Sequence, residues 1–146
     1  MRFLSSYNVD RKRHEGFCRA LIKNGISEKD QLFYNGSIRM EFLDAIIENI
    51  ISKKVECIIC GDDEICTMVM SRLQAEGYRI PKDVAIASLY NSTNLDCYSP
   101  AVTAVSVAAS QMGGTAGRQL IQRLRGENYE KKTMLDYDIL FRKSTN

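Results

Sequence analysis

The sequence predicts an α/β fold in which a mostly parallel sheet is flanked by helices. Two apolar runs, residues 55–60 and 84–89, are separated by one amphipathic helical pattern. Turn residues bracket that helix, with Gly61-Asp62-Asp63 before it and Gly77 and Pro81 after it. A strand–helix–strand unit of this kind places its two strands parallel. The carboxyl ends of parallel strands share one edge of the sheet, where such folds bind ligands.

Before this unit the pattern predicts two strands and two helices. Residues 1–7 are short and mixed, and we expect a strand there. Asn8 or Asp10 can cap the first helix, which is expected to end at Gly25. Residues 31–34 form a second strand candidate.

The second helix carries the clearest amphipathic pattern in the chain. Ser37 is its expected cap. Apolar residues then recur at helical spacing, and they are Leu43, Ile46, Ile47, Ile50 and Ile51. The third helix follows residues 61–63 and is expected to end at Gly77. Its predicted buried face consists of Ile65, Met68, Val69 and Leu73.

After the second apolar run we predict a loop, a strand, a helix and a final strand. Residues 90–98 are polar and are expected to form a loop, and residues 102–107 a strand. Residues 109–124 have helical periodicity and stop at Gly126. Residues 134–141 alternate, so they predict a last strand with Leu135, Tyr137, Ile139 and Phe141 on one side. The whole comprises four helices and five or six strands.

Composition indicates one globular domain. The chain has 146 residues, of which 45% are hydrophobic and 26% charged, with a net charge of +2. These values do not predict a strongly basic nucleic-acid binder. The sequence also lacks the apolar run of about 18 residues that a membrane span requires. We expect no signal peptide, a cytoplasmic location and reduced thiols. Cys57 and Cys60 have metal-like spacing, but residues three apart in a strand face opposite sides.

Candidate binding residues cluster at the predicted strand ends. Asp62 or Asp63 is expected to cap the third helix, which leaves the other carboxylate for ligand hydroxyls, a metal or phosphorylation. Tyr90 and Asn91 follow the next strand and offer an aromatic face and an amide, although Tyr90 could also pack on its own loop. Arg13, near the start of the first helix, either reaches the same crevice or is solvated.

No constellation of residues predicts catalysis. The sequence has no glycine-rich phosphate loop, no nucleophile elbow and no metal-ligand cluster. His14, the only histidine, is placed by the pattern among exposed charges. The sequence therefore favours a binding module over an enzyme and predicts no cofactor.

Five short motifs, in order and at consistent spacing, resemble the lactose-repressor family of bacterial transcription regulators. They are RHEGF at 13–17, CGDD at 60–63, GYRIPKDV at 77–84, YSPAVT at 98–103 and RKST at 142–145. The resemblance implies the C-terminal subdomain of a periplasmic binding protein-like type I fold. Residues 1–103 would be the effector-binding subdomain, 104–133 a crossover strand and helix normally belonging to the N-terminal subdomain, and 134–146 a return strand and tail.

The resemblance also implies effector contacts from Arg13, Asp62, Asp63, Tyr90 and Asn91. Tyr90 stands where the family usually has an aspartate, and Ser88 where a glycine is usual. Losing that carboxylate removes a charge-assisted acceptor. Either the effector differs or the crevice no longer binds one.

The predicted function is the effector-sensing and dimerisation part of a transcription regulator. We expect it to bind a small polar metabolite, a sugar above all, and to control a DNA-binding headpiece absent from this chain. The apolar face of the helix at 109–124 would need another surface, such as a second copy of the chain. Two alternatives are a stand-alone sugar-binding protein of transport and a flavodoxin-like receiver phosphorylated on Asp62 or Asp63.

Overall fold

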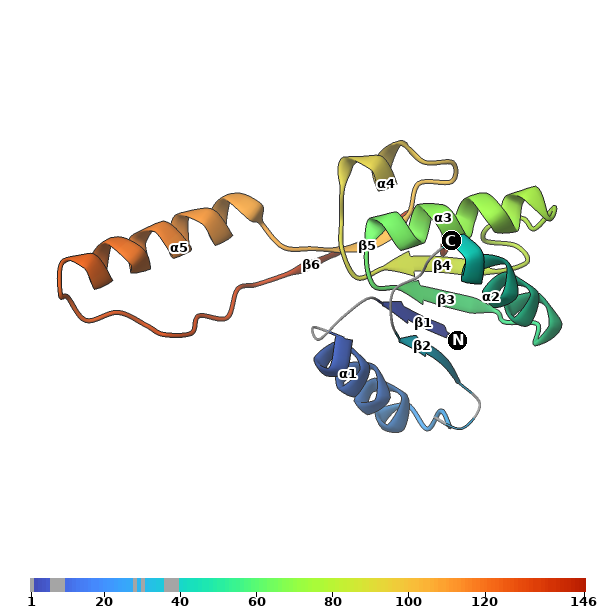
Figure 1. The fold of residues 1–146 in the computed structure, drawn as a ribbon, viewed down its shortest axis with the longest axis horizontal. Coiled ribbons are helices and arrows are strands. Elements are labelled where there is room, and N and C mark those ends of the chain that lie inside the picture. The colour runs from blue at the N-terminus through green and yellow to red at the C-terminus, as the bar shows by residue number, and fades with distance from the viewer. Residues whose placement is uncertain (1, 6–9, 28, 30, 36–39) are drawn as a thin grey trace.

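The computed structural model describes residues 2–5, 10–27, 29, 31–35 and 40–146. Within these residues six strands form one sheet in the order β2-β1-β3-β4-β5-β6 (Figure 1). The strands are β1 (Arg2–Ser5), β2 (Leu32–Asn35), β3 (Cys57–Cys60), β4 (Ala85–Ser88), β5 (Thr103–Ser106) and β6 (Asp138–Leu140). Neighbours from β2 to β5 pair in parallel, and β6 runs antiparallel to β5. The predicted fold class is confirmed, as is the parallel pairing of the two apolar runs.

Five helices connect these strands in the described part of the chain. They are α1 (Asp10–Lys23), α2 (Met40–Ser52), α3 (Asp63–Ala75), α4 (Thr93–Cys97) and α5 (Ala109–Leu124). Figure 1 shows α1 on one side of the sheet and α2 and α3 on the other. This division follows from right-handed crossovers. The chain crosses the sheet in one direction from β1 to β2, through α1, and in the opposite direction from β2 to β3 and from β3 to β4, through α2 and α3. Among the described residues no helix combines the length and apolar character of a membrane span.

The main core lies between the sheet and the layer of α2, α3 and α4. Four of the five apolar residues predicted on α2 are buried, and Ile51 packs partly buried against them. On α3 the predicted Ile65, Val69 and Leu73 are buried, whereas Met68 is only partly so. Cys66 and Met70 are buried as well. The buried face of α3 is wider than predicted because the helix packs on β3 and β4 and also touches α2 and α4.

The two central strands, β3 and β4, are not covered equally on both faces. Alternate residues of β3 and β4 are fully buried, while those between them are half-buried. The less covered face belongs to α1. That helix packs on β2, where the rings of Phe17 and Phe33 meet edge to face at 5.8 Å, so it leaves β3 and β4 partly open.

Helix ends follow the glycine signals. Gly25, Gly77 and Gly126 adopt φ values of 69°, 83° and 70°, a left-handed conformation that glycine takes without steric cost. All three predicted stops are confirmed. The predicted caps Asn8 and Ser37 lie outside the described residues.

Two predictions after β4 are wrong. Residues 90–98 are not all loop, because α4 forms there around Leu95, which is fully buried in the core. Residues 134–141 form a strand only at Asp138–Leu140. Its inward residue is Leu140, whereas Ile139 and Phe141 are exposed, since β6 lies at the sheet edge with no helix layer over it.

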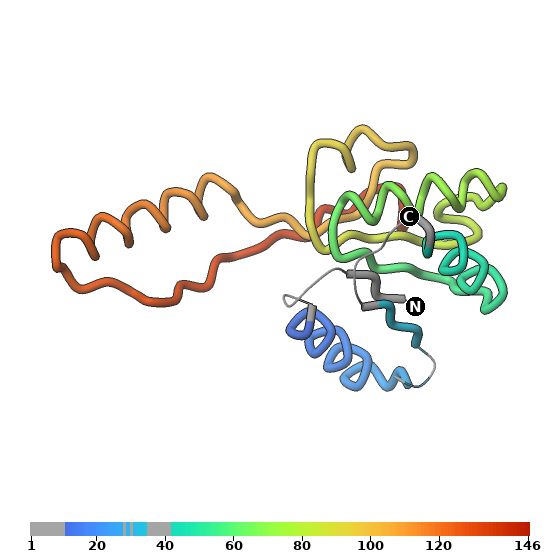
Figure 2. The backbone as a smooth tube through the Cα atoms, in the orientation of Figure 1, coloured from blue at the N-terminus to red at the C-terminus, as the bar shows by residue number. Residues whose placement is uncertain are grey.

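Residues 107–137, hereafter the arm, project from the end of the sheet (Figures 1 and 2). The arm contains α5, at the predicted boundaries, and no residue of α5 is buried. The polar side of α5 faces the returning chain, where Gln119 Nε2 donates to Thr133 Oγ1. The apolar residues Met112, Leu120 and Leu124 are exposed on the outside, and Leu124 reaches 78% exposure.

We predict that Leu73→Ala lowers the free energy of unfolding by about 2–5 kcal/mol, because it opens a cavity in the main core. Ile22→Ala, at an exposed position of α1, should change it by no more than about 0.5 kcal/mol. Urea unfolding of the three proteins measures both values. Equal losses in the two variants would contradict the assigned core.

Acid stability should depend on the turn that leads into β4. Asp83 accepts hydrogen bonds from the Arg79 side chain at 2.8 and 2.9 Å and from its backbone N–H at 2.8 Å, and these lower the pKa of Asp83 to about 2. A depressed carboxyl pKa stabilises the fold above the unfolded-state value of about 4. That contribution is lost as the pH falls through about 2.

The free energy of unfolding of Asp83→Asn should therefore differ from wild type at pH 5 and converge toward it near pH 2. Glu127→Gln, whose carboxylate lies 3.9 Å from Arg125, is the surface control. If the difference in free energy of unfolding between wild type and Asp83→Asn stays constant across this pH range, the assigned role of the Asp83 carboxylate is refuted.

Candidate functional site

The strand order reverses between β1 and β3, where the chain first steps outward to β2 and then back across to β3. In doubly wound sheets the crevice at such a reversal, outside the carboxyl ends of the strands, is the binding position. The loop after β1 lies outside the described residues. The turns after β3 and β4, residues 61–63 and 89–91, form the described part of this edge and are called the rim below.

Arg13 reaches the first rim turn from α1. Its Nη1 donates to the carbonyl oxygen of Gly61 at 3.0 Å in a partly buried contact. The hydrogen bond holds the first turns of α1 beside the end of β3, 48 residues away in sequence. The structure thus brings the guanidinium to the turn that carries Asp62 and Asp63.

The two aspartates of this turn have different positions. Asp62 is the N-cap of α3, since its backbone is extended and its Oδ1 accepts from the backbone N–H of Ile65 at 2.8 Å. Asp63 is the first residue of α3 and is half-buried. A carboxylate in the first helical turn is stabilised by the exposed N–H groups there. The prediction that one of the two acids caps the helix is confirmed, and the cap is Asp62.

The second rim turn lies directly beside the first. Cys60 pairs with Ser88 in the sheet, and the backbone N–H of Leu89 donates to the carbonyl of Cys60 at 2.8 Å. Ser88 is buried, and its hydroxyl donates to the carbonyl of Tyr90 at 2.7 Å and accepts from the Tyr90 N–H at 3.2 Å. The hydroxyl therefore fixes the backbone of Tyr90. The residue as a whole is 54% exposed.

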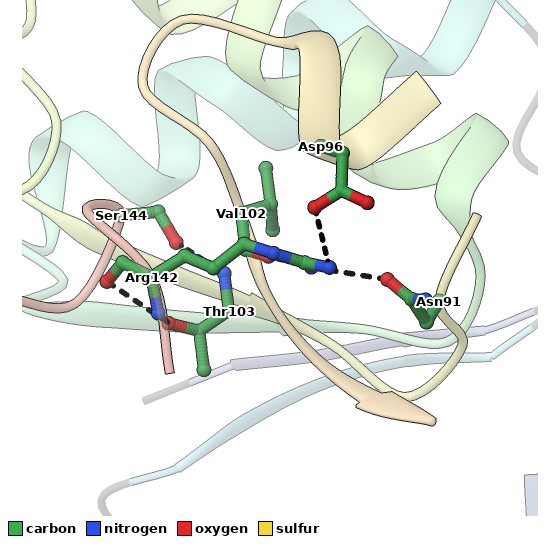
Figure 3. A network of polar contacts seen from close by, with 6 residues as sticks. All are labelled: Asn91, Asp96, Val102, Thr103, Arg142 and Ser144. Carbon is green, nitrogen blue, oxygen red and sulfur yellow. Dashed lines mark hydrogen bonds and ion pairs between the residues drawn. The ribbon is translucent and has the colours of Figure 1, made fainter. Parts of the chain in front are cut away.

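The side chain of Asn91 contacts Arg142, which the sequence did not predict to be a site residue. Its Oδ1 accepts from Arg142 Nη1 at 3.0 Å (Figure 3). Arg142 also donates to the carbonyl of Val102 at 2.6 Å and forms an ion pair with Asp96 at 2.6 Å. The predicted site residues therefore lie on two neighbouring turns. Arg13 joins Asp62 and Asp63 at the first turn, and Arg142, which was not predicted, joins Tyr90 and Asn91 at the second.

Arg142 begins a four-residue segment, 142–145, that we call the strap. Ser144, in its middle, is fully buried between β4 and the chain that enters β5. Its hydroxyl donates to the carbonyl of Ile86 at 2.6 Å and accepts from the N–H of Thr103 at 2.9 Å. The closing RKST motif was visible in the sequence, but a short polar segment carries no signal of which strands it will join.

The cysteines near the rim are unsuited to nucleophilic chemistry. A side-chain hydrogen bond with Cys66, together with burial, raises the pKa of the Cys60 thiol, and burial raises that of Cys57. Raised pKa values keep thiols protonated at neutral pH. Cys60 is buried and Cys57 half-buried, at alternating positions of β3, as predicted for residues three apart.

His14 is not among exposed charges, which corrects the prediction. Its ring packs edge to face on Phe33 with the centroids 4.2 Å apart. Its Nε2 is buried and has no hydrogen-bond partner within the described residues. The helical position of His14 turns it toward β2, which charge counting along the sequence does not reveal.

A model of the periplasmic binding protein-like domain matches residues 3–145, which is nearly the whole chain. The chain belongs to the periplasmic binding protein-like domain family. The repressor PurR of Erwinia tasmaniensis is 26% identical over 135 residues, which are 91% of this chain and 40% of PurR. PurR of Vibrio atlanticus is 26% identical over 138 residues, or 92% of this chain and 41% of that protein. The chain therefore spans about two fifths of the curated relatives it matches.

Solved structures give the same answer for the fold. The transcription regulator CcpA of Lactococcus lactis matches 99% of this chain and 54% of its own with a TM-score of 0.87 at 24% identity. The transcriptional regulator CelR in complex with cellobiose matches 98% of this chain and 46% of its own with a TM-score of 0.83 at 23% identity. The resemblance to the lactose-repressor family inferred from the five motifs is confirmed.

We predict that Asp62→Ala destabilises the protein by about 0.5–2 kcal/mol, because the N–H of Ile65 loses its cap. Ser92→Ala is the matched control, since Ser92 is the N-cap of α4 but makes no capping hydrogen bond. Thermal unfolding measures both. A loss in Ser92→Ala as large as that in Asp62→Ala would contradict the assigned cap.

Proposed function

We propose that this chain is the effector-sensing and dimerisation part of a lactose-repressor-type transcription regulator. The rim is proposed to bind a small polar metabolite, with sugars as the first class to test. Binding would shift the equilibrium between two arrangements of the regulator, and so control a DNA-binding headpiece. Family membership and the names of the relatives, all transcriptional regulators, support this proposal.

The observation that carries the proposal is the contact of Arg13 with Gly61 at the reversal of strand order. It brings a guanidinium to the turn that carries Asp62 and Asp63. Sugar hydroxyls both donate and accept hydrogen bonds, so they suit a site that offers charged donors and charged acceptors together. The exposed ring of Tyr90 adds an apolar face on the neighbouring turn.

The site is proposed to be half of a cleft, with residues 1–103 as one subdomain and the arm contributing to a second. The arm supports this reading because α5 turns its polar side toward the returning chain and leaves its apolar side uncovered. An uncovered apolar surface of this kind is typical of a subunit or domain interface. CelR, a structural neighbour, was solved with cellobiose, which makes disaccharides a reasonable part of the test.

Isothermal titration with D-ribose, D-glucose and cellobiose tests the effector class. We expect at least one of these sugars to bind, and Arg13→Ala to weaken it about tenfold or more, as expected for loss of a charge-assisted hydrogen bond. Arg11→Ala is the matched control on the same helix, because within the described residues Arg11 pairs only with Glu15, one helical turn away, at 2.8 Å. No binding of any of the three sugars, or equal weakening in the two variants, would contradict the proposal.

The proposed homodimer is tested by sedimentation. We expect the wild-type chain to self-associate with rising concentration, and Leu120→Glu combined with Leu124→Glu to remain monomeric, since charges on the exposed side of α5 disfavour its burial. Ile22→Glu, at an exposed apolar site on α1, should leave association unchanged. A wild-type chain that stays monomeric throughout would refute dimerisation through the arm.

A further inference from the structure

The backbone of the strap is held on both sides. The N–H of Ser144 donates to the carbonyl of Ala101 at 3.0 Å, and its carbonyl accepts from the N–H of Ile86 at 3.0 Å. Arg142 is fixed in the same way, because its N–H donates to the hydroxyl of Thr103 at 2.9 Å. The side chain of Arg142 therefore starts from a rigid base.

From this base the guanidinium reaches three segments that are separate in sequence. Nη1 donates both to Asn91 Oδ1 and to the carbonyl of Val102, and Nη2 pairs with Asp96 Oδ1 (Figure 3). The Arg142 side chain is only 13% exposed, whereas that of Asp96 is 55% exposed. Solvent screens the ion pair with Asp96, so the partly buried bonds to Asn91 and Val102 contribute more to order.

These contacts fix which way the Asn91 amide faces. Arginine offers only donors, so it selects the amide oxygen and turns the NH₂ group away. That NH₂ group has no hydrogen-bond partner among the described residues. An ordered amide with two unused donors, directly after the exposed Tyr90, is a donor pair ready for a ligand.

We propose that Arg142 is a positioning residue of the rim, which holds the Asn91 amide so that its NH₂ group is presented to a hydroxyl-bearing effector. The inference rests on the proposed function for the identity of the ligand. The ordering of Asn91 by Arg142 stands on the geometry alone. A lysine in place of Arg142 keeps the charge but lacks the planar set of donors that bridges the three acceptors.

The wild-type protein provides the first test. ¹⁵N relaxation of side-chain NH₂ groups should give Asn91 an order parameter of about 0.8, near that of rigid backbone, and Asn94 a value below about 0.6. Asn94 is the internal control because it lies at an exposed position of α4 without a hydrogen bond from its side chain in the described structure. Loss of one signal in Asn91→Asp assigns the resonance. An Asn91 amide as mobile as that of Asn94 overturns the proposal, whatever the variants do.

Arg142→Lys provides the second test, with Arg125→Lys as the control at an exposed arginine. In Arg142→Lys the Asn91 order parameter should fall to the Asn94 value, while Arg125→Lys leaves it unchanged. A role confined to stability would lower the unfolding temperature of Arg142→Lys without mobilising the Asn91 amide at temperatures where the protein is folded. That result would overturn the proposal.

Titration of the same variants with D-ribose, D-glucose and cellobiose links order to binding. Any of these sugars that wild type binds should bind to Arg142→Lys at least about fivefold more weakly. Arg125→Lys should bind the same sugar as tightly as wild type does. Unchanged affinity in Arg142→Lys overturns the role in presenting Asn91. If wild type binds none of the three sugars, the proposed function fails instead, and the relaxation data alone decide whether Arg142 orders Asn91.

Discussion

The hydroxyl of Ser144 joins β4 to β5 at a point where the two strands share few bonds of their own. Only Ala87 with Thr103 and Ser88 with Ala104 pair in this part of the sheet. Ser144 fills the adjacent gap by donating to Ile86 and accepting from Thr103, and its backbone bonds Ile86 and Ala101. Because Ile86, Thr103 and Ser144 are buried, breaking a hydrogen bond between them leaves a polar group without a partner, at a cost of about 1–3 kcal/mol.

Several features of the rim depend on this connection. The strap that carries Ser144 also carries Arg142, which binds the loop after β4, the short helix α4 and the chain entering β5. The same segment follows β6, the strand by which the arm returns to the sheet. The geometry of the second rim turn is thus set by residues some 50 positions further along the chain, whereas the first turn is set locally by the cap of Asp62 and by Arg13.

Sequence patterns predicted what local physics decides. The spacing of apolar residues on α2, the Asp62 cap and the glycine stops each depend on neighbours within a few residues, and each is confirmed. The parallel pairing of β3 with β4 follows from the helix between them. The sequence left two predictions for Arg13, contact with the rim or exposure to solvent. The structure shows the contact with the first rim turn, because right-handed crossovers place the starts of helices at the ends of strands.

What the sequence did not predict depends on long-range contacts or on exposed surface. The helix α4 forms in a polar segment because one residue, Leu95, enters a core built by other elements. The alternation at residues 134–141 predicted a buried face, but an edge strand without a covering layer has none. Arg142 had no periodic or compositional signal, since its three acceptors come together only in the folded sheet. For the same reason the hydrogen bond between Asn91 and Arg142 could not be predicted.

The central claim is that the strap holds the second half of the rim to the sheet, and native-state hydrogen exchange in Ser144→Ala tests it most directly. In this variant the amides of Ile86 and Thr103, which donate to Ser144, should exchange at least about tenfold faster than in wild type, a change of about 1.4 kcal/mol in opening free energy. Ile58 of β3, which has no hydrogen bond to the strap in the described part of the chain, should keep its wild-type rate. Unchanged exchange at Ile86 and Thr103 would contradict the account.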